Sequence, residues 1–278
     1  MLRTRRDRCP GALRPWPAED GLLVRLRLIG GRLPAESLRR LVDVAEEYGD
    51  GRVRLTGRAN LQLRGLPARG GALTPEVLAA VEATGLLPSR THELIRNVMV
   101  SPQTGLAGGR VDLRPVAADL DRRLCASPRL AQLPGRFLFV LDDGRGDLRD
   151  RPCDLGLVAL DATRAQLRVG ERWGPVVALA DAAGAVARLA GTFVDRRGCG
   201  PTAAWHVAEL RHPLAPEEQP DGRLPAPAPP PAYGVVPGGR HIAVPDGLDR
   251  RTAEAVAAEA DELVVTPWRG VLVPEVGR

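Results

Sequence analysis

The stretch from Gly51 to Leu63 reads Gly-Arg-Val-Arg-Leu-Thr-Gly-Arg-Ala-Asn-Leu-Gln-Leu and continues as Arg64-Gly65. From Leu55 onward, small or apolar residues alternate with polar ones. Because successive side chains of a strand point to opposite faces, this pattern predicts an extended segment with one face in a core. The opposite face carries hydrogen-bonding side chains throughout, namely Thr56, Arg58, Asn60, Gln62 and Arg64. Guanidinium and amide groups suit planar, anionic ligands, so this face is the predicted binding surface.

The alternative interpretation of this face is the solvated side of an antiparallel sheet, which is commonly polar. Two features favour a binding surface instead. Asparagine is uncommon inside strands, and no acidic residue among the five polar positions could pair with the two arginines. We therefore expect the arginines to await an anion.

The basic residues of the chain do not predict nucleic-acid binding. The 278 residues include 39 basic and 34 acidic ones, a formal net charge of +5, and every basic residue is arginine. The basic excess is scattered among acidic residues and is not gathered into a patch. The scattered charge therefore does not indicate a nucleic-acid partner. No apolar run is long enough for a membrane span, so we do not expect a membrane as partner either.

The four cysteines, Cys9, Cys125, Cys153 and Cys199, are far apart in the sequence. Such spacing predicts free thiols, and the basic start at residues 1–6 is not followed by the apolar segment of a signal peptide. Together these features predict a cytoplasmic protein. They also argue against a zinc or iron–sulfur site built from neighbouring cysteines.

Both ends of the chain predict the same order of elements. The first part predicts a strand over 22–29, a helix from about Pro34 and a strand from Arg52. The last part predicts a short strand at 241–244, a helix at 252–260 and a strand at 262–273. Thr266 aligns with Thr56 without a gap over eight positions, where the polar columns now hold Trp268, Gly270 and Leu272. This predicts an internal repeat in which one copy keeps a polar face; two unrelated strands are the alternative.

Between the copies, the sequence predicts a mixed body followed by a linker. Helices are expected at 75–84 and from Asp181 to about Phe193, and strands at 136–141, 156–160 and 165–169. Residues 220–237 are rich in proline and without pattern, which is typical of an extended linker. The expected domains are residues 1–70, 71–213, a linker at 214–238, and 239–278.

Two further motifs are candidates for function. His92 and Arg96 would share a face if their segment were helical, but a metal role for His92 would need partners among the few other histidines, so we do not favour it. Arg136 follows the turn Leu133-Pro134-Gly135 at the root of a predicted strand. A solvated arginine at the strand end is the plain alternative.

Taken together, the motifs resemble those of the sulfite and nitrite reductase superfamily. The matching blocks are Asp7–Gly11, Thr56–Gly65, Arg96–Val98, Leu133–Phe137, Leu141–Asp147 and Thr266–Gly270. Within the superfamily, the chain most resembles the precorrin-3B synthase family of aerobic cobalamin biosynthesis. The resemblance extends over nearly the whole chain.

The resemblance implies an α+β fold in which two ferredoxin-like half-domains, related by a pseudo-twofold axis, flank an α/β domain. It implies an oxidoreductase that hydroxylates a precorrin with oxygen and forms a lactone. The residues implied to hold the tetrapyrrole are Arg58, Asn60, Gln62, Arg64, Arg96, Asn97 and Arg136. A basic residue expected two places after Arg136 is Leu138, which argues against sulfite or nitrite reduction.

The family is also expected to carry a [4Fe–4S] cluster on two close pairs of cysteines, which this sequence lacks. Siroheme is not expected, because we find no haem-ligand cysteine, and the use of iron stays open. The chain would then be catalytically incomplete alone. The alternatives are a non-catalytic tetrapyrrole-binding module, or half of a split enzyme whose second polypeptide carries the cluster.

Overall fold

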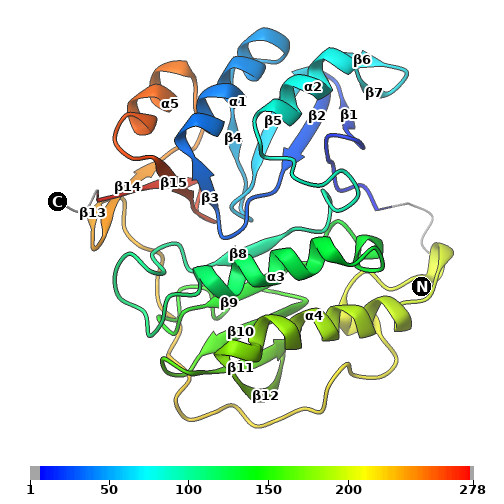
Figure 1. Cartoon of the computed structure of the whole chain (residues 1–278), viewed down its shortest axis with the longest axis vertical. Coiled ribbons are helices and arrows are strands. Elements are labelled where there is room, and N and C mark those ends of the chain that lie inside the picture. Colours follow the sequence, from blue (N-terminus) through cyan, green and yellow to red (C-terminus); the bar gives the residue numbers. More distant parts are fainter. Residues whose placement is uncertain (1–6, 276–278) are drawn as a thin grey trace. The chain divides into compact units, whose positions relative to one another are not determined.

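The computed structural model describes residues 7–275 and divides the chain into two compact units (Figure 1). The repeat unit comprises Cys9–Leu94 and the segment from Pro231 onward, and the body unit comprises chiefly Ile95–Pro230. The expectations for residues 1–6, and for the last three residues, lie outside the described part of the chain. Within residues 7–275, no helix combines the length and apolar character needed to cross a membrane.

The first half of the repeat unit is a sheet covered by a helix. Its strand order is β1-β2-β5-β4, formed by Trp16–Ala18, Gly21–Leu26, Leu61–Leu66 and Arg54–Leu55. The helix α1, Ala35–Tyr48, begins after Pro34 as predicted and buries Leu38, Leu41, Val42 and Ala45 at helical spacing. A hairpin of β6 and β7 (Ala68–Arg69, Ala72–Leu73) then leads to α2, Pro75–Ala83, whose first turn is capped by Thr74.

The second half repeats the first strand for strand. Its strands β13, β14, β16 and β15 are Gly234–Val236, Gly239–Ala243, Gly270–Pro274 and Glu262–Val265, with α5 at Arg250–Ala257. The sheet order β13-β14-β16-β15 matches β1-β2-β5-β4 position by position. The predicted α+β fold with an internal repeat is confirmed.

The two halves exchange short backbone segments with each other. The short strand β3, Arg32–Pro34, follows β2 in the chain but pairs with β15 of the second half. Reciprocally, Leu248 pairs with Val53 of the first half through two backbone hydrogen bonds of 2.9 and 2.8 Å. Each half therefore supplies an edge to the other.

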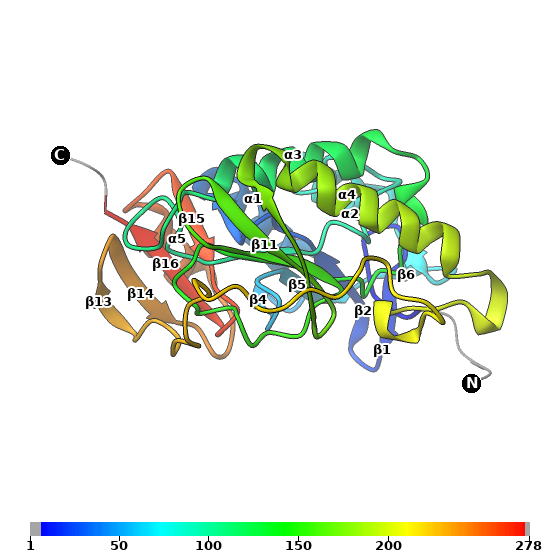
Figure 2. The ribbon, with the colours of Figure 1, turned by 90° about the horizontal axis from the view of Figure 1, so that it is seen from below.

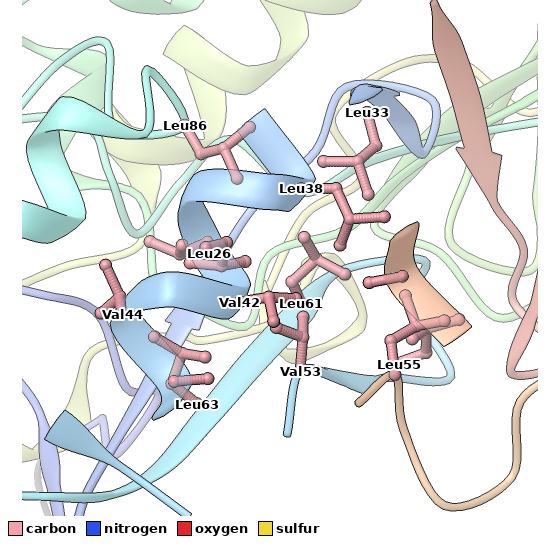
Figure 3. Close-up of a cluster of buried hydrophobic side chains, with 14 of the residues drawn as sticks. Leu26, Leu33, Leu38, Val42, Val44, Val53, Leu55, Leu61, Leu63 and Leu86 are labelled. Atoms are coloured by element: carbon pink, nitrogen blue, oxygen red, sulfur yellow. The ribbon is translucent and has the colours of Figure 1, made fainter. Parts of the chain in front are cut away.

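One hydrophobic core joins the halves. Figure 3 shows leucine and valine side chains from α1, β3 and β5 meeting in this cluster. Leu33, Leu248 and Leu263 are fully buried members of it, so the exchanged segments are anchored in the same core. Burying one such side chain stabilises the fold by about 1.5–3 kcal/mol.

The body unit is a five-stranded mixed sheet with two helices. The order β12-β11-β10-β9-β8 is formed by Arg172–Ala178, Arg164–Val169, Leu155–Ala159, Phe139–Asp142 and Val98–Val100. Strands β8, β9 and β10 run parallel and the others antiparallel. Helices α3 (Arg114–Ala126) and α4 (Leu179–Arg196) lie side by side against the sheet (Figure 2). Short 3-10 turns occur at Leu130–Gln132, Gly200–Thr202 and Val207–Glu209.

The proline-rich linker is fastened to the body unit. Arg110 donates to the carbonyl of Arg223 at 2.5 Å, and the backbone N–H of Ala228 donates to Gly146 at 3.0 Å. The amide of Gln166 donates to the carbonyl of Gln219 at 2.9 Å. Proline lacks a backbone donor, so these bonds from neighbouring residues and side chains hold the segment in an extended course.

Candidate functional site

The segment predicted as one extended strand from Leu55 onward is part of a hairpin and not one continuous strand. Strands β4 and β5 pair with each other, placing Arg54 opposite Gln62. Between them the N–H of Thr56 donates to the carbonyl of Asn60 at 2.9 Å, and Ala59 adopts a left-handed φ of 55°. The predicted single face from Thr56 to Arg64 was therefore wrong. The alternation of polar and apolar residues continues by chance through a tight turn. An alternating pattern alone cannot distinguish the residues of such a turn from those of a strand.

Two residues that were predicted to bind the tetrapyrrole lie in this turn. Asn60 is buried, and its side-chain oxygen accepts the N–H of Leu28 at 3.0 Å. That bond fastens the turn to the end of β2, which gives Asn60 a structural role. Arg58 is partly exposed, and its backbone N–H donates to the Thr56 hydroxyl at 3.4 Å.

Arg64 is already paired. Its Nε and Nη2 donate to the two carboxylate oxygens of Asp20 at 2.9 and 3.1 Å. The same hydrogen bond lowers the pKa of Asp20. The expectation that no acidic residue pairs with these arginines was wrong for Arg64, because β1 and β2 turn at Asp20 and bring it alongside β5.

A basic pocket of about 580 Å³ opens in the repeat unit beside the hairpin turn. The first half lines it with Arg25, Arg52, Arg54, Leu55, Thr56, Gly57 and Gln62. The second half contributes Pro245, Asp246 and Arg269. Four arginines and one aspartate line the pocket, and Asp50 and Asp249 lie beside two of these arginines, so the lining keeps a smaller excess of positive charge.

Arg25 is a half-buried cation of this pocket. Its Nη2 donates to the side-chain oxygen of Gln62 at 3.3 Å, while its buried Nε has no hydrogen-bond partner. Burial lowers the pKa of Arg25, and the positive charge of Arg58 acts in the same direction while Cys9 opposes it. An arginine remains charged even so, and a buried donor without a partner favours a bound acceptor.

The other three arginines differ in how they are held. Arg54 Nη1 lies 2.6 Å from an oxygen of Asp50, although the pair lacks hydrogen-bond geometry. Arg52 lies 4.0 Å from the carboxylate of Asp249. Arg269 is exposed and adopts a left-handed φ of 57°. Their charges can approach an anion from several directions.

The remaining predicted residues lie in the body unit. Arg96 is buried and makes a bidentate ion pair with Asp121 at 2.6 and 2.8 Å. Asn97 donates to the carbonyl of Gly135 at 2.8 Å. Arg136 is exposed, with its guanidinium carbon 5.5 Å from the ring centre of Trp205.

Of the predicted set, the structure places Gln62 in the wall of the basic pocket. Arg25, Arg52, Arg54 and Arg269 were missed. A signal was available for Arg25, since it is the polar residue of an alternating strand that pairs directly with Gln62. His92 is buried, and its Nδ1 lies 2.8 Å from the Thr91 hydroxyl.

The described residues do not fit an iron–sulfur cluster. Residues 7–275 contain no group of three or more histidines, cysteines or acidic residues that could hold a metal ion. Burial raises the pKa of the Cys153 thiol to about 11, which opposes the thiolate that a metal needs. None of the four cysteines, all of which lie within residues 7–275, forms a disulfide bond.

Comparison with known proteins finds matches for part of the chain. Residues 16–82 match the family model of the nitrite/sulfite reductase ferredoxin-like half domain. These residues contain the first half, including Arg25, the hairpin turn and Gln62. The predicted relationship to the sulfite and nitrite reductase superfamily is confirmed.

Within this class, the chain is similar to a precorrin-3B synthase from Sinorhizobium sp., with 31% identity over 144 residues. It is also similar to a ferredoxin–nitrite reductase from Synechococcus elongatus, with 32% identity over 130 residues. These matches cover 50% and 44% of this chain, but only 29% and 25% of the respective relatives. The chain thus aligns with less than a third of either enzyme.

A solved structure extends the similarity to nearly the whole fold. The NirA protein of Mycobacterium tuberculosis superimposes with a TM-score of 0.71 at 18% identity. The match covers 95% of this chain and 59% of that one. It shows a shared fold across both units.

Proposed function

We propose that the basic pocket binds the carboxylate rim of a tetrapyrrole, and that the chain is the tetrapyrrole-binding part of a precorrin-3B synthase-like oxidoreductase. The observation that carries the proposal is the half-buried Arg25, whose buried Nε has no hydrogen-bond partner, beside Gln62 in a pocket with four arginines. Acetate and propionate groups are planar acceptors that match the fork of a guanidinium. The similarity to a precorrin-3B synthase supports this ligand class.

In this proposal, the chain's own residues bind and orient the ligand. Arg25 and Arg54 would hold carboxylates from the first half, Gln62 would fix the orientation of Arg25, and Arg269 would close the pocket from the second half. Leu138 supports the cobalamin branch over nitrite reduction. This position, where the reductases are expected to carry a basic residue, holds a buried apolar side chain.

The proposal also includes an iron–sulfur cofactor that is held by a second polypeptide. A [4Fe–4S] cluster would supply electron transfer, and we propose that its ligands come from outside residues 7–275. Iron and sulfide analysis after anaerobic purification of this chain tests this. We expect neither in stoichiometric amount, and stoichiometric iron with sulfide would contradict it. A cytoplasmic location stays a prediction.

Binding is tested with uroporphyrin, a porphyrin that carries only carboxylate side chains, followed by fluorescence quenching. We expect Arg25→Ala and Arg54→Ala to weaken binding roughly tenfold or more, the effect of losing a charged hydrogen bond. Arg64→Ala is the matched control. It removes the same charge from the same sheet outside the pocket, and it should leave the affinity unchanged.

Two results would count against the pocket. One is equal weakening by Arg25→Ala and Arg64→Ala, which would indicate a general effect of net charge. The other is the absence of saturable binding to the wild-type chain.

A further inference from the structure

The turn between β15 and β16 delivers Arg269 to the basic pocket. The N–H of Thr266 donates to the carbonyl of Gly270 at 2.8 Å, and that of Arg269 to Thr266 at 3.2 Å. Arg269 itself has the left-handed φ of 57°. This conformation costs a residue with a side chain on the order of 1 kcal/mol, so contacts around the turn must maintain it.

The corresponding turn of the first half is fastened in a way that the second half cannot copy. In the first turn, the side chain of Asn60 accepts the N–H of Leu28 and ties the turn to β2. The equivalent position in the second turn is Gly270, which has no side chain to make such a bond. The second turn therefore needs another attachment.

His241 provides the first attachment. Its Nδ1 lies 3.1 Å from the carbonyl oxygen of Pro231 and 3.2 Å from that of Ala232. A carbonyl can only accept, so Nδ1 carries the proton and Nε2 accepts from the Thr266 hydroxyl at 3.0 Å. Glycine at 270 is required here, since an added Cβ would lie 2.2 Å from His241 Nε2.

Tyr233 provides the second attachment. Its hydroxyl donates to the carbonyl of Trp268 at 2.6 Å, next to Arg269 in the turn. Its ring packs against His241 with 4.6 Å between ring centres. The segment Pro231–Tyr233 and His241, which we call the brace, thus hold the turn at Thr266 and at Trp268.

We propose that Tyr233 and His241 are positioning residues that hold the Thr266–Gly270 turn so that Arg269 faces the ligand of the basic pocket. This inference rests on the proposed function of that pocket. The brace does not touch the ligand. It fixes the position of Arg269, the cation that the second half contributes to a pocket lined mainly by the first half.

A double-mutant cycle with uroporphyrin tests the brace. Tyr233→Phe keeps the ring on His241 and removes the hydroxyl, and we expect it to weaken binding about three- to tenfold. In an Arg269→Ala background, Tyr233→Phe should cause no further loss. Both single variants should also reduce the salt dependence of binding, because each takes the same charge away from the ligand. Tyr48→Phe, the other tyrosine of the chain, is the matched control and should bind like wild type.

The outcomes distinguish the positioning role of the brace from tetrapyrrole binding by the pocket. Wild-type affinity in Tyr233→Phe, or equal losses with and without Arg269, would overturn the brace and leave the pocket standing. Absence of uroporphyrin binding by the wild-type chain would instead overturn the proposed function. His241→Asn keeps a donor toward Pro231 but loses the Thr266 contact. It should give the same dependence on Arg269, and it serves as the second test if Tyr233→Phe disturbs the hairpin.

Discussion

The two halves of the repeat unit carry different side chains on the same strand plan. Arg25 pairs with Gln62 on the first sheet, and His241 pairs with Leu272 at the equivalent place on the second. The first pair lines a basic pocket, whereas His241 is turned inward onto the chain's own carbonyls. At this place the second half therefore presents no arginine to a pocket.

The hairpin turns sharpen the contrast. Both turns have the same pattern of backbone hydrogen bonds. In both, the fourth residue adopts a left-handed conformation; it is Ala59 in the first turn and Arg269 in the second. The two turns thus share a backbone conformation but differ in their side chains, and the basic pocket takes lining residues from both halves. The shared backbone and the different side chains can be tested separately.

The largest expected effect concerns the exchanged segments. Leu33 and Leu248 are fully buried at the two exchanged edges, so Leu33→Ala and Leu248→Ala should each lower the free energy of unfolding by about 2–5 kcal/mol. Chemical denaturation of each variant measures its free energy of unfolding, and hydrogen–deuterium exchange locates the loss within the repeat unit. If only one variant were destabilised, only one of the two swapped segments would anchor the shared core.

Swapping the turn residues should have the next largest effect. Asn60→Gly removes the bond to Leu28 and should cost about 1–2 kcal/mol. Gly270→Asn drives a Cβ into His241 and should cost about 1–3 kcal/mol. Thermal unfolding of both variants compares them. Tolerance of asparagine at 270 would mean that the two turns are interchangeable.

The halves should also differ in their response to pH. Burial lowers the pKa of His241 below its unfolded value, so its contribution to stability is present above the unfolded pKa. That contribution is lost as the pH falls below the unfolded value toward the folded one. We expect the protection factors of the amides in β14 and β16, which correct for the intrinsic pH dependence of exchange, to fall as the pH drops below about 6.5, the ordinary pKa of histidine, and those in β2 and β5 to respond less.

A group in the body unit gives the opposite sign and serves as a control. Burial raises the pKa of Asp147 to about 7, so its contribution is fully present below the ordinary carboxyl pKa and is lost as the pH rises from there to about 7. Asp147→Asn should remove that loss and leave the acid response of β14 unchanged. Persistence of the acid response in His241→Gln would contradict its assignment to His241.

The smallest effect is expected at the exposed pair of Arg64 and Asp20. Arg64→Ala should change the free energy of unfolding by less than about 1 kcal/mol, since solvent screens both charges. The same denaturation experiment detects it. A larger loss would mean that the paired arginine supports the sheet edge.

Much of the fold could be predicted from periodicity. The helix after Pro34, the helix at Pro75 and the repeated strand order follow from apolar spacing and end signals. The turn at Thr56–Asn60 could not, because its residues alternate in polarity as a strand would. The pairing of β3 with the other half was equally hidden, since local pattern carries no record of a distant partner.

The site was predicted in character more than in detail. An arginine-rich surface near the hairpin was expected, and Gln62 lies in it. Arg64 was lost from the predicted set because Asp20 is distant in sequence and becomes its partner only through sheet pairing. Arg269 was missed because its role depends on the second half approaching the first, which alternation does not report.

The exchanged strand β3 also has a consequence for synthesis. Its partner β15 leaves the ribosome only after the whole body unit and the linker, so for on the order of ten seconds β3 has no edge to join. During that interval Leu33 and the first half's unfinished core face solvent, and the open sheet edge can pair with other chains. Chaperone demand should therefore be concentrated on the first hundred residues of the nascent chain.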